Sequence, residues 1–183
     1  MIFVGIGGVS RSGKSTLSLL LRDALVQQQG KRVQVLHQDD WVRPESEIPR
    51  IKGHTDWECP ESMDFRRLEQ AMRAAATDCD VVIVEGILVF YDEAVNALFD
   101  RRYLVEADRE TFLARRAQET RWGPEPPWYP EYVWEGYLRW GRELGGGGVV
   151  RVLKSGQPNW QQPVWEDWGV KNTIKRSELK FLV

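Results

Sequence analysis

Residues 8–15 combine two glycines, a lysine and a serine at a spacing that suits anion binding. They read G-V-S-R-S-G-K-S, which fits the Walker A pattern G-x-x-x-x-G-K-[ST]. Successive backbone N–H groups at a helix N-terminus can surround a triphosphate, and glycine brings the backbone close without a Cβ in the way. Lys14 can reach the β- and γ-phosphates, and the Ser15 hydroxyl can ligate Mg²⁺. We therefore expect ATP or another nucleoside triphosphate to bind at Gly8, Ser10, Arg11, Ser12, Gly13, Lys14, Ser15 and Thr16.

Carboxylates follow two of the apolar runs that predict strands. Asp39 and Asp40 come after the run at 33–36, and Glu85 directly follows the run at 81–84. The carboxyl ends of parallel strands face the ligand crevice. We expect Asp39 to be the base that orients an acceptor hydroxyl and takes its proton, and Glu85 to lie near the metal. The alternatives are an Asx turn at Asp39 or Asp40 and a glutamate that only caps backbone.

Three arginines in the later half could close over a transferring phosphoryl group. Arg115, Arg116 and Arg121 lie on or after a predicted helix. Cations there could form a lid over roughly residues 115–130. A solvated helix face is the alternative.

The elements that must position these residues alternate between strand and helix. Apolar runs predict strands at 2–6, 33–36, 81–84, 103–105 and 149–153, and apolar spacing predicts helices at 14–30, 63–76 and 131–144. Asp108 can cap a further helix, residues 43–59 are polar and irregular, and 145–148 form a glycine turn. The order predicts one α/β domain over 1–183, a three-layer P-loop NTPase fold with about five parallel strands, helices on both faces and a small lid.

Composition, net charge and residue counts argue against several other classes of protein. Hydrophobic residues make up 42% of the 183 residues and the formal net charge is −2, so we expect no nucleic-acid partner and no membrane association. The N-terminus lacks the features of a signal peptide, and Cys59 and Cys79 are too few for a disulfide framework, so we expect a cytoplasmic protein. His37 and His54 share no zinc-like spacing with cysteine and are interpreted as structural. The nine tryptophans favour core and lid packing, with one or two free to stack on flat rings.

The chain resembles the nicotinamide riboside kinases, within the wider uridine kinase and phosphoribulokinase group. Residues 38–48 read Q-D-D-W-V-R-P-E-S-E-I, similar to the family's Q-D-D-F-F-K-P-E-S-E-I. Residues 57–64 look like the family's aromatic-acid segment, and 85–90 (E-G-I-L-V-F) are similar to E-G-F-L-L-F. The likeness extends through 127–138 and fades beyond Gly145, so the part from 146 onward is atypical.

The resemblance implies an ATP-dependent kinase that phosphorylates the ribose 5′-hydroxyl of nicotinamide riboside in NAD biosynthesis, as a monomer or homodimer. It implies Asp39 as base, Trp57 as the aromatic that stacks on the nicotinamide ring and Glu58, one methylene longer than the usual Asp, as the acid that binds the ribose hydroxyls. Arg121 and Trp122 match further substrate contacts, and Glu85 the acid near Mg²⁺. The loop at 153–157 is the candidate for contact with adenine.

Two other functions stay open at this point. A uridine or cytidine kinase would need donors and acceptors aimed at the edge of the base, whereas Trp57 offers a ring face and one N–H. A regulatory module would bind triphosphate without phosphorylating an acceptor, and the acids Asp39, Asp40 and Glu58 argue against it.

Overall fold

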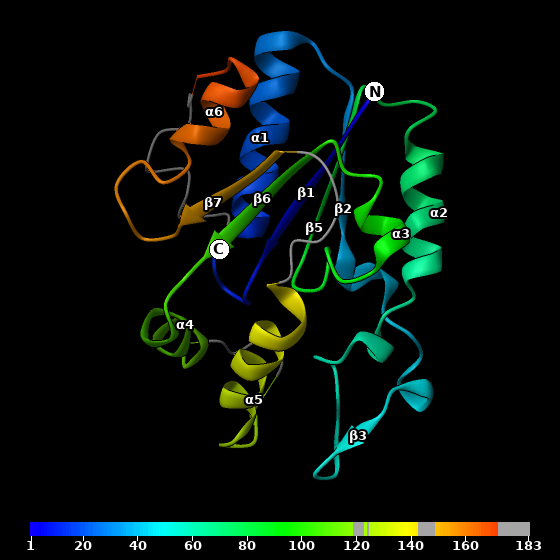
Figure 1. The fold of residues 1–183 in the computed structure, drawn as a ribbon, viewed down its shortest axis with the longest axis vertical. Helices are drawn as coiled ribbons and strands as arrows, with labels where there is room; N and C mark the ends of the chain where they lie inside the picture. The colour runs from blue at the N-terminus through cyan, green and yellow to red at the C-terminus, as the bar shows by residue number, and fades with distance from the viewer. Residues whose placement is uncertain (119–122, 124, 143–148, 172–183) are drawn as a thin grey trace.

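A five-stranded parallel sheet forms the centre of the protein in the computed structural model, which describes residues 1–118, 123, 125–142 and 149–171. The strand order is β2-β5-β1-β6-β7, and each neighbouring pair is parallel (Figure 1). The strands are β1 (Ile2–Gly8), β2 (Val33–His37), β5 (Val81–Gly86), β6 (Arg101–Glu106) and β7 (Val149–Lys154). All five predicted strands are therefore confirmed, with ends that differ by up to two residues.

Helices cover both faces of the sheet, which confirms the three-layer α/β prediction (Figure 1). On one face α1 (Lys14–Gln29) and α6 (Gln162–Trp168) pack against the side of β1 that carries Val4 and Ile6. On the other face α2 (Phe65–Ala75) and α3 (Glu93–Asn96) cover β5 and β1. The apolar runs of β1 and β5 are continuous because both strands are buried on two sides.

The helices begin and end where local chemistry allows. The predicted helix at 14–30 ends at Gly30, whose φ of 63° provides a left-handed C-terminal residue. The helix expected from Met63 begins two residues later, because Asp64 caps it by accepting from the Arg67 N–H at 3.0 Å. Asp108 caps α4 (Arg109–Arg116) through the Thr111 N–H at 2.7 Å, as predicted.

A third apolar cluster lies beyond the carboxyl ends of β1 and β6. The helix predicted at 131–144 instead begins at Tyr129, with Pro130 in its first turn, as α5 (Tyr129–Gly136). It continues as a π-helical turn (Tyr137–Gly141), and the predicted glycine turn at 145–148 lies outside the described residues. Val9, Phe112 and residues of α5 form the cluster that joins these helices to the loop after β1.

Residues 43–59 carry more structure than expected. They contain a short hairpin of β3 (Arg50–Ile51) and β4 (His54–Thr55). Lys52 and Gly53 connect the two strands with φ values of 49° and 80°, the pattern of a type I′ turn. A one-turn 3₁₀ helix at Glu45–Glu47 precedes the hairpin. The two strands are only two residues long, too short for a periodic pattern to predict.

The Trp-rich C-terminal part also folds onto the sheet. Helix α6 was not predicted, yet it buries Trp165 and Trp168 beside β1 and α1. These two tryptophans are core residues, in line with the packing interpretation. None of the helices among the described residues combines the length and apolar character needed to cross a bilayer.

Candidate active site

The glycines of the loop between β1 and α1 are required by close contacts. A Cβ on Gly8, at φ 153°, would lie 2.4 Å from the Val105 carbonyl oxygen. Gly13 has a φ of 102°, in the region that favours glycine. The Ser12 N–H donates to the Val9 carbonyl oxygen at 3.1 Å and closes the turn. The loop thus curls tightly into the N-terminus of α1, the arrangement predicted from residues 8–15.

Ser15 and Glu85 meet at the carboxyl end of β5. The Ser15 hydroxyl donates to Glu85 Oε1 at 2.9 Å, and His37 Nδ1 lies 2.7 Å from the same oxygen. Burial alone would raise the pKa of Glu85, but the hydrogen bond with His37, the charge of Lys14 and the Ser15 hydroxyl together lower this pKa. The hydrogen bond to Glu85 raises the pKa of His37. Glu85 is therefore held as a carboxylate.

The other oxygen of Glu85 is an unusual feature. Oε2 is buried and has no hydrogen-bond partner among the described residues. A buried carboxylate oxygen without a partner is costly, and a cation or its water shell would satisfy it. A serine hydroxyl and a carboxylate are oxygen ligands that suit Mg²⁺, so these residues fit that ion. The described part of the chain contains no group of three or more His, Cys, Asp or Glu side chains that could hold a metal ion without other ligands.

Asp39 is positioned by a buried glutamine at the end of β2. Gln38 accepts the Leu88 N–H through Oε1 at 2.9 Å and begins a 3₁₀ helix (Gln38–Trp41). Any side chain on Gly86 would collide with Gln38, since a Cβ would lie 1.9 Å from Oε1. This packing directs the chain so that Asp39 stands at the sheet edge where the phosphate loop lies.

Asp39 has an exposed side chain within electrostatic reach of both Lys14 and Glu85. Crowding by surrounding protein atoms raises the pKa of Asp39, and the positive charge of Lys14 only partly offsets this. A carboxylate with a raised pKa is a stronger base, and so is better matched to accepting a proton from a hydroxyl.

The next segment of chain brings Trp57 and Glu58 to the same edge. Trp57 is 40% exposed, so its ring is open to a partner. Glu58 is half-buried, and burial raises its pKa to about 7 although Arg116 and a hydrogen bond from Tyr129 act in the opposite direction. The Tyr129 hydroxyl donates to Glu58 Oε1 at 3.3 Å. Asp39 also contributes to the field at Glu58, so the two acids share one region.

Two of the predicted lid arginines contact the phosphate loop. Arg115 donates to the Arg11 carbonyl oxygen at 2.9 Å, and Arg116 donates to the Ser10 hydroxyl at 2.9 Å. Arg116 is buried and also forms an ion pair with Glu125. The alternative of a solvated helix face is wrong for Arg116. Arg121 and Trp122, the other predicted contacts, lie outside the described residues.

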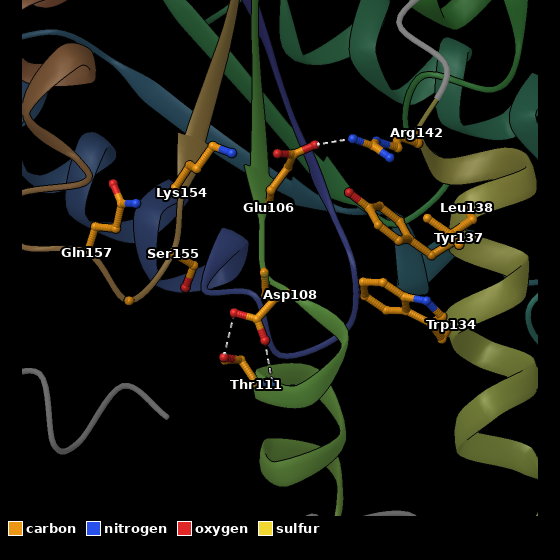
Figure 2. Close-up of a pocket in the computed structure, with 12 residues that line it drawn as sticks. Glu106, Asp108, Thr111, Trp134, Tyr137, Leu138, Arg142, Lys154, Ser155 and Gln157 are labelled. Atoms are coloured by element: carbon orange, nitrogen blue, oxygen red, sulfur yellow. Dashed lines mark hydrogen bonds and ion pairs between the residues drawn. The ribbon is translucent and has the colours of Figure 1, made fainter.

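A cavity of about 560 Å³ lies at the carboxyl ends of β6 and β7. Figure 2 shows Trp134 and Tyr137 pointing from α5 and its π-helical turn toward Glu106 and the loop that carries Lys154, Ser155 and Gln157. Ser155 accepts a hydrogen bond from Arg115 at 3.1 Å, so the cavity adjoins the phosphate loop through one arginine. The Tyr137 hydroxyl is buried and has no partner among the described residues.

Proteins with sequences similar to this chain are kinases, which agrees with the geometry of the site. Nicotinamide riboside kinase 2 of Mus musculus is 29% identical over 175 residues, which covers 85% of this chain and 87% of the relative. Its Homo sapiens counterpart is 27% identical over 85% of this chain and 74% of the relative. The chain is a relative of the nicotinamide riboside kinases. The predicted resemblance to these kinases is thus confirmed, although no family model matches the chain.

Solved structures share the fold of this chain. An unliganded sugar kinase from Janibacter sp. HTCC2649 superposes with a TM-score of 0.65 at 17% identity, covering 94% of this chain and 96% of the other. A putative kinase from Chloroflexus aurantiacus gives a TM-score of 0.55 at 17% identity, covering 92% and 97%. At such identities the likeness concerns the fold alone.

Sequence reasoning missed several residues that this relative of the nicotinamide riboside kinases brings to the site. His37, interpreted as merely structural, contacts Glu85. Tyr129 contacts Glu58, and Tyr132 donates to Asp56 Oδ2 at 2.6 Å. The available signal was the pair of tyrosines three residues apart, which lie on one face of a helix.

Proposed function

We propose that the protein transfers the γ-phosphoryl group of ATP to the ribose 5′-hydroxyl of nicotinamide riboside, giving nicotinamide mononucleotide. The observation that supports this most directly is a shared sheet edge. The ends of β2, β5 and β1 bring Asp39, Glu85 and the phosphate loop together, and Trp57 and Glu58 lie next to them. The kinase names of the relatives support the same reaction.

The phosphate donor is held by backbone and charge. The N–H groups of the loop and the N-terminus of α1 suit the triphosphate, and Lys14 neutralises its β- and γ-phosphates. Ser15 and Glu85 are the residues that would hold Mg²⁺, which supplies further charge neutralisation at the phosphates when bound. Arg115 and Arg116 contact the phosphate loop, so they can add positive charge beside the transferring group.

The acceptor is oriented by carboxylates and an indole. Asp39 accepts the hydrogen of the 5′-hydroxyl and holds its oxygen in line with the γ-phosphorus. Glu58, when ionised, can accept from two vicinal ribose hydroxyls. The exposed face of Trp57 can stack on a cationic pyridinium ring. Because phosphoryl transfer has a loose transition state, positioning and charge neutralisation carry most of the rate, more than proton removal does.

The cavity at the ends of β6 and β7 is the proposed site for the base of the donor. Along the sheet edge, β2 and β5 lie on one side of β1, while β6 and β7 lie on the other. A triphosphate whose γ-phosphate faces Asp39 therefore extends its nucleoside toward β6 and β7. Lys154–Gln157, part of the predicted adenine loop, line the cavity there. The buried Tyr137 hydroxyl and the ring of Trp134 suit a flat heterocycle with hydrogen-bonding groups.

A bulky side chain placed in this cavity should weaken the binding of ATP and leave the binding of the acceptor unchanged. Leu138 lines the cavity and is 44% exposed, so Leu138→Trp can fill space without disturbing the core. We expect the KM for ATP to rise at least about fivefold while the KM for nicotinamide riboside stays within about twofold. Val26→Trp is a matched control, since Val26 is 45% exposed at the far end of α1. Unchanged KM for ATP in Leu138→Trp would place the base elsewhere.

Loss of the Trp57 ring should weaken the binding of the acceptor and leave the binding of ATP unchanged. Cation–π stacking on an indole contributes roughly 1–2 kcal/mol, so Trp57→Ala should raise the KM for nicotinamide riboside roughly 5- to 30-fold. Trp57→Phe should recover part of the loss because it keeps a flat ring. Steady-state kinetics with the acceptor varied at saturating ATP measure both effects. A KM that Trp57→Ala leaves unchanged would remove Trp57 from the acceptor site.

One panel separates this proposal from its rivals. The purified protein with Mg²⁺-ATP is offered nicotinamide riboside, uridine, cytidine and simple alcohols, and the phosphorylated products are quantified. The proposal expects nicotinamide riboside to have the highest kcat/KM. Preference for uridine or cytidine would favour the pyrimidine kinase alternative. ATP binding without any phosphorylated product would favour a regulatory module.

A further inference from the structure

We infer that Tyr129 and Tyr132 are positioning residues, a pair of hydroxyls on α5 that hold the segment from Asp56 to Glu58 in the geometry that receives the acceptor. The inference rests on the proposed function, because Trp57 and Glu58 are its acceptor contacts. It goes further by assigning their placement to a helix that is distant in sequence and by giving the two tyrosines different effects.

Tyr132 acts on the backbone of the segment. Its hydroxyl donates to Asp56 Oδ2 at 2.6 Å, and Asp56 Oδ1 accepts the Glu58 N–H at 3.2 Å. Asp56 is 7% exposed, and its own N–H donates to the Pro49 carbonyl oxygen at 2.8 Å. Asp56 therefore links α5 to the start of the segment, and Trp57 projects from between two restrained residues.

Tyr129 acts on the side chain of Glu58. Its hydroxyl donates to Oε1 at 3.3 Å, which leaves Oε2 as the second oxygen for an acceptor hydroxyl. Tyr129 is only 2% exposed, and its ring lies 4.5 Å from the His54 ring of the hairpin. The hydroxyl is thus aimed by packing on both sides and cannot turn away freely.

The helix also connects this segment to the phosphate loop. The Arg116 guanidinium lies 6.0 Å from the centre of the Tyr129 ring, and the same side chain donates to the Ser10 hydroxyl. One face of α5 is therefore in contact with an acceptor residue and with a cation bound to the loop. These contacts can fix the position of the acceptor segment relative to the phosphate loop.

The two tyrosines differ in how they affect the charge of Glu58. The charged and titratable groups around Glu58 are Arg116 from α4, Tyr129 from α5, Asp39 after β2 and Asp56 in its own segment. Arg116 and the Tyr129 hydrogen bond lower its pKa, whereas the two aspartates raise it. Loss of the Tyr129 hydroxyl should therefore move this pKa further up, while loss of the Tyr132 hydroxyl removes no direct bond to the carboxylate.

Two conservative variants of the whole chain test the inference. With nicotinamide riboside varied, Tyr132→Phe and Tyr129→Phe should each raise the acceptor KM about fivefold, the loss expected for one hydrogen bond at a positioned group. The KM for ATP should stay within about twofold in both. Tyr91→Phe serves as a control, because Tyr91 is 44% exposed and stacks only on Phe65 among the ring contacts of the described residues.

The pH dependence separates the two roles. For the wild type, kcat/KM for nicotinamide riboside should fall as pH drops below about 7, because a protonated Glu58 accepts fewer hydrogen bonds. In Tyr129→Phe this fall in kcat/KM should begin at a higher pH, and in Tyr132→Phe it should begin at the same pH as in the wild type. The inference is overturned if both variants keep the wild-type acceptor KM and pH profile, or if the KM values for ATP and acceptor rise together. If the wild type phosphorylates no riboside at all, the proposed function itself fails.

Discussion

Lys14→Ala is expected to lower kcat at least about 100-fold, because it removes the fixed cation aimed at the phosphates. Lys14 follows Gly13 at the start of α1, and its charge acts on both Asp39 and Glu85. The change in charge on the phosphates is largest in the transition state, so kcat should fall more than nucleotide affinity does. Initial rates at saturating ATP and nicotinamide riboside, together with nucleotide binding by calorimetry, measure the two effects separately.

Lys31→Ala is the matched control for this prediction. Lys31 is an exposed lysine just beyond the opposite end of α1, so its removal changes net charge equally without touching the loop. Its kcat should stay within about twofold of the wild type. A Lys14→Ala enzyme with comparable kcat would show that Lys14 does not act on the transferring group.

Asp39→Ala is expected to lower kcat at least about 100-fold with little change in the KM for ATP. The carboxylate orients the acceptor hydroxyl and takes its proton, and both contributions vanish together. Asp39→Asn keeps the shape and removes the charge, so the activity that it retains measures orientation by the remaining carbonyl oxygen. Product formation from nicotinamide riboside in single-turnover experiments isolates the chemical step.

The neighbouring Asp40 offers a control within the same 3₁₀ helix. Asp40→Asn should retain nearly wild-type turnover, because Asp40 is exposed and none of the hydrogen bonds found among the described residues involves its side chain. Near-normal turnover in Asp39→Ala would remove Asp39 from the base role. Equal losses in both positions would indicate that the helix, and not one carboxylate, matters for the reaction.

Local sequence was sufficient for the phosphate loop and for the strands around it. The loop lies within residues 8–15, and its spacing reflects backbone geometry that eight consecutive residues can impose by themselves. The strands at the centre of the sheet were predictable because burial on both faces demands unbroken apolar runs. The same logic placed Asp39 and Glu85 at strand ends, and thus at one edge of a parallel sheet. Their chemical roles stay predictions.

The partners of these residues were decided only by the tertiary structure. His37 and Glu85 are 48 residues apart, Tyr132 and Asp56 are 76 apart, and Arg116 and Ser10 are 106 apart. These pairs meet because of the strand order β2-β5-β1-β6-β7 and because of the face that α5 turns toward the segment before it. Neither feature leaves a periodic signal in the sequence. A carboxylate at a strand end can be read from sequence, because every parallel strand ends at the same edge. Which hydroxyl or cation meets that carboxylate depends on side-chain packing between distant segments, which only the folded chain determines.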